Sequence, residues 1–349
     1  MEYILIEECC DILDSRRIPI TASDRMSGPY PYYGANGVQD YVADYIFDDE
    51  LVLLAEDGGN FGSKTRPIAY RVSGKCWVNN HAHVLKPMAS MDVDHLCYSL
   101  MFYDTGELVN GATRQKLTQT AMRKMLIPQR SLQEQKRIVC ELSKVQSIIS
   151  ARQQQLQKLD ELVKARFIEL FGDPELNPRG LPVLPWNAVF LTTTGKLDSN
   201  AMVENGRYPF FTCAKESYKI DSYAFDCEAL LLAGNNAAGI YDVKHYKGKF
   251  NAYQRTYVLR LMNEKWSYIL FKRQLEDKLQ YLQSQSKGTN TRYLTLGILN
   301  ELHFVVPPVA EQEQFAAFVE QTDKSKVAVQ KALDEAQLLF DSLMQKYFG

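Results

Sequence analysis

The residues best suited to chemistry in this 349-residue chain form a run of basic, aromatic and amide side chains at 244–255, with the sequence KHYKGKFNAYQR. Lysine and arginine contact phosphate oxygens, and arginine, asparagine and glutamine hydrogen-bond to base edges in the major groove of DNA. A shorter run, KCWVNNH at 75–81, occupies the corresponding place in the first half of the chain. Either run alone fits a solvated loop or strand edge equally well, so it is their repeated placement that favours nucleic-acid binding.

A second pair of polar clusters has the same repeated placement. GATRQK at 111–116 corresponds to KGTNTR at 287–292. We therefore expect DNA contacts from both halves of the chain. In the first half the candidate DNA-binding residues are Lys64, Arg66, Lys75, Asn79, Asn80, His81, Arg114 and Lys116. In the second half they are Lys215, Asn235, Asn236, Lys247, Lys249, Gln254, Arg255, Lys287, Asn290 and Arg292.

Patterns typical of catalysis or metal binding are not found in the sequence. The Gly-rich stretch 56–65 lacks the lysine directly after glycine that a phosphate-binding loop requires, because Ser63 stands there. His81 and His83 would share one face of a strand, but no further ligands follow at an obvious spacing. The Asn-Pro-Pro-aromatic motif of adenine methyltransferases is absent. We therefore expect no catalytic residue, no metal and no cofactor in this chain.

Composition and charge indicate a globular protein without a strong overall preference for nucleic acid. The net charge is −2, but residues 1–130 carry 13 Lys and Arg against 17 Asp and Glu, whereas residues 181–308 carry 15 against 11. No apolar run of about 18 residues and no signal peptide are found, so we expect no membrane contact. Seven cysteines without regular spacing fit a reducing cytoplasm, where we expect the protein to be.

Two long segments that begin with Glu-Gln and end with Phe-Gly are expected to position the polar loops. They cover 134–172 and 311–349, so the second repeats the first with a shift of 311 − 134 = 177 residues. Apolar residues recur in each at steps of three and four, which predicts two helices packed as an antiparallel coiled coil. The predicted seam residues are Ile138, Leu142, Val145, Ile149, Leu156, Leu159, Val163 and Leu170 in the first helix, and Phe315, Val319, Val329, Leu333, Ala336, Phe340, Leu343 and Tyr347 in the second.

Four polar residues interrupt this stripe: Arg152, Arg166, Thr322 and Lys326. Two interpretations are open. Their polar ends can reach solvent at the edge of the seam, or they can fix the antiparallel register of the helices.

The globular segments are duplicated as well. GPYPYY at 28–33 corresponds to GRYPFF at 206–211. Short runs of branched and aromatic residues such as 52–55 and 257–261 predict strands, and 93–103 and 266–285 predict helices. The expected fold class is α+β: two pseudo-twofold-related α+β domains separated by two long antiparallel coiled-coil helices. The expected boundaries are a first domain at 1–130, a helix at 131–172, a Pro/Gly linker at 173–180, a second domain at 181–308 and a helix at 309–349.

This duplicated architecture, with YPYYGANGVQDYVADYIFDDELVLLAEDG at 30–58 and GKFNAYQRTYVL at 248–259, resembles the specificity subunit of type I restriction–modification systems over essentially the whole chain. The two helices resemble the conserved spacer regions of that family, and the globular segments resemble its target-recognition domains. The resemblance implies a non-catalytic subunit in which each domain reads one half of a bipartite, asymmetric DNA site. The helices would set the spacing between the halves and dock the modification subunits.

The resemblance also implies partners and cofactors. The partners would be double-stranded DNA, two modification subunits that methylate adenine with S-adenosylmethionine, and up to two restriction subunits that use ATP and magnesium. The cofactors would belong to the partner subunits.

Two other functions remain open from the residues. The acidic excess of 1–130 fits a protein-interaction scaffold without DNA binding, which a steep salt dependence of DNA affinity would exclude. A nuclease or methyltransferase with an unrecognised site would show activity with magnesium or S-adenosylmethionine alone.

Overall fold

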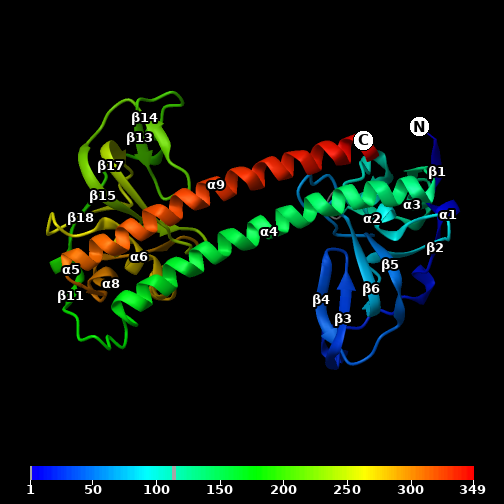
Figure 1. Cartoon of the computed structure of the whole chain (residues 1–349), viewed down its shortest axis with the longest axis horizontal. Helices are drawn as coiled ribbons and strands as arrows, with labels where there is room; N and C mark the ends of the chain where they lie inside the picture. The colour runs from blue at the N-terminus through cyan, green and yellow to red at the C-terminus, as the bar shows by residue number, and fades with distance from the viewer. Residues whose placement is uncertain (1, 112–114) are drawn as a thin grey trace. The chain divides into compact units, whose positions relative to one another are not determined.

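The computed structural model of the chain describes residues 2–111 and 115–349, which group into two compact units. Unit 1 holds Met1–Gln153 with Lys331–Gly349, and unit 2 holds Gln154–Gln330. Each unit therefore combines one globular part with segments of both long helices (Figure 1). The sequence-based boundaries instead assigned each long helix to a segment of its own, outside the two globular domains. Within the described residues, no helix is both long and apolar enough to cross a membrane.

Unit 1 is built on a six-stranded sheet with the strand order β2-β7-β5-β6-β3-β4. Neighbouring strands pair antiparallel except β3 and β6, which pair in parallel. The strands of the unit are β1 (Tyr3–Leu5), β2 (Cys10–Ile12), β3 (Ser27–Gly34), β4 (Gly37–Val42), β5 (Phe47–Ala55), β6 (Ala69–Val78), β7 (Ala82–Pro87), β8 (Val109–Asn110), β9 (Lys116–Leu117) and β10 (Leu126–Pro128). Its short helices are α1 (Ile6–Cys9), α2 (Val93–Met101) and α3 (Gln119–Arg123).

Unit 2 repeats this topology strand by strand. Its six-stranded sheet has the order β12-β18-β15-β17-β13-β14, again with one parallel pair, β13 and β17. The strands are β11 (Val183–Pro185), β12 (Phe190–Thr194), β13 (Tyr208–Phe211), β14 (Tyr218–Ile220), β15 (Phe225–Ala233), β16 (Asn235–Asn236), β17 (Val243–Ala252), β18 (Thr256–Leu261), β19 (Arg292–Tyr293) and β20 (His303–Val305). The short helices are α5 (Trp186–Val189), α6 (Tyr268–Asp277), α7 (Leu279–Gln285) and α8 (Leu296–Asn300). The expected α+β class is confirmed.

The core of each unit lies where one helix covers the central strand. The second halves of β5 and β15, LVLLA and ALLLA, are continuously buried, as expected for strands covered on both faces. In unit 1, Val52 and Leu54 belong to the same buried cluster as Leu96 and Leu100 of α2. In unit 2 the corresponding cluster contains Leu230 and Leu232 with Leu270, Phe271 and Leu275 of α6.

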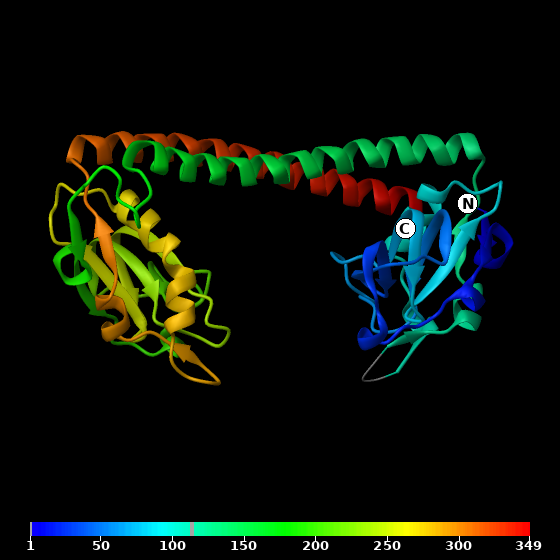
Figure 2. The same cartoon turned by 90° about the horizontal axis from the view of Figure 1, so that it is seen from below.

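The two long helices are α4 (Leu132–Phe171) and α9 (Val309–Phe348), each of 40 residues, as the repeated segments predict. In unit 1, Ile138 and Leu142 from the start of α4 cluster with Phe340 and Tyr347 from the end of α9. In unit 2, Phe167 and Phe171 from the end of α4 pack on Phe315 from the start of α9, with ring centroids 5.6 and 5.7 Å apart. The helices therefore run antiparallel within each unit (Figure 2).

The seam residues expected from the sequence are all buried or half-buried in the structure. The seam prediction missed Phe167 and Phe171, which are each 2% exposed. Among the polar interruptions, Lys326 Nζ lies 2.7 Å from Asp160 Oδ1 on the other helix. Thr322 instead satisfies its hydroxyl within α9, because Oγ1 donates to the carbonyl of Phe318 at 2.9 Å.

One helix prediction is corrected. Residues 266–285 form two helices, α6 and α7, that meet at Lys278. The Lys278 N–H donates to the carbonyl of Leu275, three residues back, at 3.1 Å. This tighter turn ends α6 and redirects the chain into α7.

Candidate nucleic-acid interface

In each unit three separate chain segments are joined at the end of the central strand. In unit 1 the Glu56 N–H donates to the His81 carbonyl at 2.9 Å, and the Glu56 carbonyl accepts from the Leu117 N–H at 2.7 Å. In unit 2 the Gly234 N–H donates to the Arg255 carbonyl at 2.8 Å, and its carbonyl accepts from the Leu294 N–H at 2.8 Å. We call each set of three residues the loop junction of its unit. The two junctions are equivalent in strand order and hydrogen bonding.

A polar side chain beneath each junction holds the third segment in place. In unit 1, His83 Nε2 lies 2.9 Å from the Leu117 carbonyl oxygen, and in unit 2 the Tyr257 hydroxyl donates to the Leu294 carbonyl at 3.0 Å. His83 and Tyr257 stand at the same place on equivalent strands, β7 and β18. Different side chains therefore fix the same backbone geometry.

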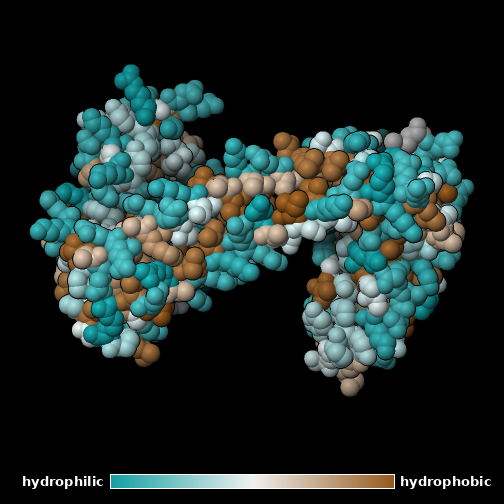
Figure 3. Space-filling view, in the orientation of Figure 1, coloured by the Kyte–Doolittle hydropathy of each residue, from teal (hydrophilic) through white to brown (hydrophobic). Residues whose placement is uncertain are grey.

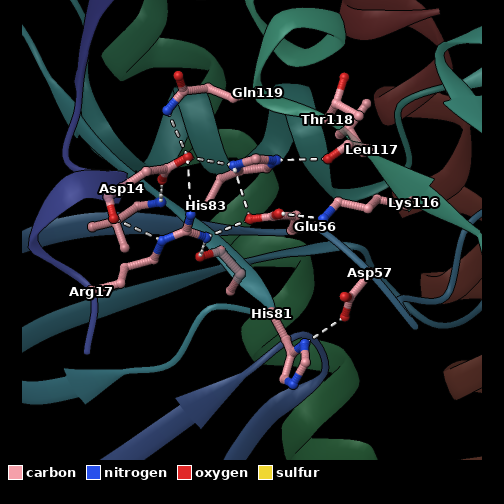
Figure 4. Close-up of polar contacts among 12 residues, drawn as sticks. Asp14, Arg17, Glu56, Asp57, His81, His83, Lys116, Leu117, Thr118 and Gln119 are labelled. Carbon is pink, nitrogen blue, oxygen red and sulfur yellow. Dashed lines mark hydrogen bonds and ion pairs between the residues drawn. The ribbon is translucent and has the colours of Figure 1, made fainter. Parts of the chain in front are cut away.

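In unit 1 this support is a buried network of charges (Figure 4). His83 is fully buried, and its Nδ1 lies 2.6 Å from Asp14 Oδ2. Both neighbours of the ring, the Asp14 carboxylate and the Leu117 carbonyl, are acceptors, so the ring satisfies both only when both nitrogens carry a proton. Burial opposes ionisation of Asp14, but hydrogen bonds from His83 and the Val84 N–H, with the Arg17 charge, lower the pKa of this carboxyl.

The same network brings one ligand atom each of Asp14, Glu56 and His83 within 4.8 Å of one another, a spacing that a metal ion could bridge. The donor atoms are already engaged. Asp14 Oδ1 accepts from the Val84 N–H at 2.9 Å. Glu56 faces Arg17 Nη1 at 2.6 Å and Lys116 Nζ at 3.0 Å. With both nitrogens of His83 also hydrogen-bonded, the arrangement fits an internal charge network better than a metal site.

The structure places several predicted residues of unit 1 around its junction. His81 belongs to the junction, and its Nδ1 lies 2.6 Å from Asp57 Oδ1. Asn80 is exposed beside it, and Lys64 and Arg66 lie exposed on the loop between β5 and β6. Asn79 is only 3% exposed, and its amide donates to Gln39 Oε1 at 3.0 Å while its oxygen accepts from the His81 N–H. Arg114 lies outside the described residues.

The predicted residues of unit 2 gather in the same way. Asn235 and Asn236 form β16, which pairs with Arg292 and Tyr293 of β19 directly beside the junction. Gln254 and Arg255 are exposed in the turn between β17 and β18, and Lys287 and Asn290 are exposed on the segment before β19. Asn235, Arg255, Thr291 and Tyr293 line a pocket of about 440 Å³.

Four predicted lysines do not join the junctions. Lys215 is exposed on the loop after β13, and Lys247 on β17 pairs with Glu228 at 3.0 Å. Lys75 and Lys249 stand opposite Asp48 and Asp226, at the starts of β5 and β15 and not at their junction ends. Their ammonium groups lie 4.5 Å from the Tyr45 ring and 4.7 Å from the Tyr223 ring. These equivalent contacts indicate a shared structural role for the two residues.

Asp57 and Tyr293, the chain neighbours of the junction residues Glu56 and Leu294, were not among the candidates. An acidic residue and a lone tyrosine do not stand out among basic and amide residues. The repeat itself holds the signal: a shift of 178 residues pairs Asp57 with the candidate Asn235, and a shift of 177 pairs Tyr293 with the candidate Lys116.

Comparison with known proteins agrees with this architecture. The family model for the type I restriction modification DNA specificity domain matches residues 1–161 and 189–336. The chain is 36% identical over 160 residues to the type I restriction enzyme EcoDI specificity subunit of Escherichia coli, covering 43% of this chain and 35% of that protein. It is also 36% identical over 139 residues to the putative type I restriction enzyme specificity subunit S.HindORF215P of Haemophilus influenzae, covering 40% and 36%. Each of these matches spans about a third of the relative's length.

Among solved structures, the type I restriction–modification S subunit from M. genitalium is similar, with a TM-score of 0.67 at 15% identity. The match covers 100% of this chain and 96% of that one. At this level of identity the likeness concerns the fold. Because the family model matches well over half of the sequence, the chain belongs to the family of type I restriction–modification DNA specificity domains.

Proposed function

We propose that this chain is the DNA sequence-recognition subunit of a type I restriction–modification complex, in which each unit reads one half of a bipartite, asymmetric site. The observation that carries the proposal is the repeated loop junction. Both units present three segments through the same backbone hydrogen bonds, and the side chains that surround them differ. Such a pair of reading surfaces suits a target whose two halves have different sequences.

We assign the other two parts of the proposed function, docking of partner subunits and spacing of the half-sites, to the long helices. Large hydrophobic residues remain exposed along them, including Ile148, Leu162 and Ile168 on α4 and Val327 and Leu338 on α9. Hydrophobic surface along these helices is visible in Figure 3. Exposed apolar surface of this kind favours protein partners, and we assign it to two modification subunits. The α4 and α9 helices would also set the number of base pairs between the half-sites.

In this proposal the chain itself catalyses nothing. The modification subunits would methylate adenine with S-adenosylmethionine, and up to two restriction subunits would cleave DNA with ATP and magnesium. The chain would select the DNA sequence for both activities.

Salt dependence provides a direct test. The complex of this chain with its modification subunits should bind duplex DNA containing its target with an affinity that falls steeply as salt rises, because phosphate contacts release counterions. The net charge of −4 over residues 1–130 supports the competing function, a scaffold that binds only proteins. An affinity for duplex DNA that is weak and insensitive to salt would favour that scaffold.

A further inference from the structure

The two loop junctions allow residues of the two units to be matched individually. Asp57 pairs with Lys116 in an isolated antiparallel bridge, and Asn235 pairs with Tyr293 in the equivalent antiparallel ladder. The third match comes from the junction itself, where the carbonyls of His81 and Arg255 accept the equivalent hydrogen bonds from Glu56 and Gly234. Three positions therefore correspond across the units: Asp57 with Asn235, His81 with Arg255, and Lys116 with Tyr293.

The chemistry at these three positions differs completely between the units. Unit 2 presents an amide, a guanidinium and a phenol around a pocket of about 440 Å³, and Tyr293 is 40% exposed. Asparagine can bond the N6 and N7 atoms of adenine, and arginine the O6 and N7 atoms of guanine, each through two hydrogen bonds. Asn235 and Arg255 are therefore suited to purine edges.

Unit 1 presents a carboxylate, an imidazole and an ammonium group instead (Figure 4). Asp57 Oδ1 lies 2.6 Å from His81 Nδ1, and so it fixes the orientation of the ring. Lys116 Nζ lies 3.0 Å from Glu56 Oε1, whereas unit 2 has Gly234 at the position of Glu56. The acidic pair Glu56 and Asp57 has no acidic counterpart in unit 2, where Gly234 and Asn235 occur.

We propose that these three matched positions determine which bases each half-site contains, and that Asn235 and Arg255 read purine edges in the half-site of unit 2. The inference rests on the proposed function and adds the residues that select the bases. The backbone hydrogen bonds of the loop junction hold these positions in the same way in both units. The side chains at the three positions differ between the units and would select different bases.

The test compares methylation motifs of complexes assembled from the full chain and its modification subunits. Asn235→Ala and Arg255→Ala should relax one or two base positions in one half-site, with a loss of discrimination of about 10- to 100-fold at each. The other half-site should stay unchanged. Asp57→Asn should alter the opposite half-site. Lys265→Ala, an exposed change in unit 2 outside the junction, is the matched control and should leave both halves unchanged.

Arg255→Lys separates base reading from phosphate contact, because it keeps the charge and removes the paired hydrogen bonds. Retained affinity for non-specific DNA with a relaxed half-site supports the proposal. An unchanged motif in Arg255→Lys and in both alanine variants overturns it, as does an equal loss of methylation at all sites without relaxation of either half. If the wild-type complex directs no split motif, the proposed function itself fails. This outcome is distinct from failure of the present proposal, in which the wild-type motif is split and the variants leave it unchanged.

Discussion

The Gln135 side-chain oxygen accepts a hydrogen bond from the Asp92 N–H at 2.7 Å. This contact joins the first turn of α4 to the first turn of α2, because Asp92 is the N-cap of α2. Gln312 Oε1 accepts from the N–H of Ser267, the N-cap of α6, at 2.9 Å. Both glutamines are 1% exposed. The glutamine of each repeated Glu-Gln pair therefore forms a buried hydrogen-bonded contact between a long helix and its globular part.

Replacing Gln312 with Ala should destabilise unit 2 by about 2–4 kcal/mol, because the half-buried Ser267 N–H and the buried Pro307 carbonyl lose their partner. Hydrogen exchange of α6 would report the loss. Gln154→Ala, on an exposed position of α4, is the control and should have little effect. Protection of α6 in Gln312→Ala equal to that in Gln154→Ala would contradict a stabilising role for this contact.

A buried histidine predicts acid sensitivity of unit 1. His95 is fully buried on α2 against Phe348, and within the described residues neither ring nitrogen has a hydrogen-bond partner. Burial and the nearby Arg130 charge lower the pKa of His95 to about 4. The unfolded chain takes up this proton near pH 6.5, so stability should fall as the pH drops from about 6.5 to about 4, by up to about 3 kcal/mol.

His95→Leu should remove this pH dependence, since unit 2 has the buried Leu270 at the equivalent position, three residues after its N-cap. Hydrogen exchange of α2 at pH 7 and pH 5 measures the difference. His303→Gln, at an exposed histidine, serves as the comparison. The same loss of protection at pH 5 in His95→Leu as in the unmodified chain would assign the effect to other groups.

The Asp14–His83 pair should behave as one coupled unit. His83→Ala leaves the Asp14 carboxylate buried with one partner fewer, and we expect a loss of about 3–5 kcal/mol. The double change with Asp14→Ala should cost clearly less than the sum of the two single changes. Additive losses in denaturant titrations would show that the two residues act independently.

The cluster of Asp14, Glu56 and His83 should not change the stability of the protein in response to metal ions. Because the ligand atoms of Asp14, Glu56 and His83 are engaged with one another and with Arg17 and Lys116, zinc or a chelator should leave the melting temperature unchanged. A rise of the melting temperature with zinc that His83→Ala abolishes would identify a metal site, since binding to the folded state stabilises it.

The proposed spacer role of α4 and α9 predicts how the gap between the half-sites can be changed. Four residues inserted after Gln153 and after Gln330, where the two units divide, lengthen each helix by about 6 Å. At about 3.4 Å per base pair, the gap in the methylated motif should grow by one or two base pairs. The same insertion into the linker 173–180 lengthens neither helix and should leave the gap unchanged. An unchanged gap after both helix insertions would exclude the helices as the spacer.

The long helices and the α+β class could be predicted because their signals are local and repeated. The seam depends on residues three or four positions apart, such as Ile138 and Leu142, which any helix brings together. The loop junctions could not be predicted in the same way. They join Glu56, His81 and Leu117 through backbone hydrogen bonds that are independent of side-chain type.

The same reason explains why the burial and strand position of individual candidates could not be predicted. Asn79 is of a residue type that contacts bases, but the fold buries it against Gln39 of β4. Lys75 and Lys249 were grouped with the other candidates, but their strands carry them to the opposite end of β5 and β15. Residue type alone therefore does not decide which residues share a surface, because the strand pairing does.

The proposed function is tested most directly by single-molecule sequencing of methylated adenines in cells that contain the modification subunits, with and without this chain. If each unit reads one half-site, the cells with the chain should show a motif of two defined halves separated by a fixed gap, which disappears when the chain is removed. A motif that persists in cells lacking the chain would contradict the proposed function, as would a single continuous motif without a gap.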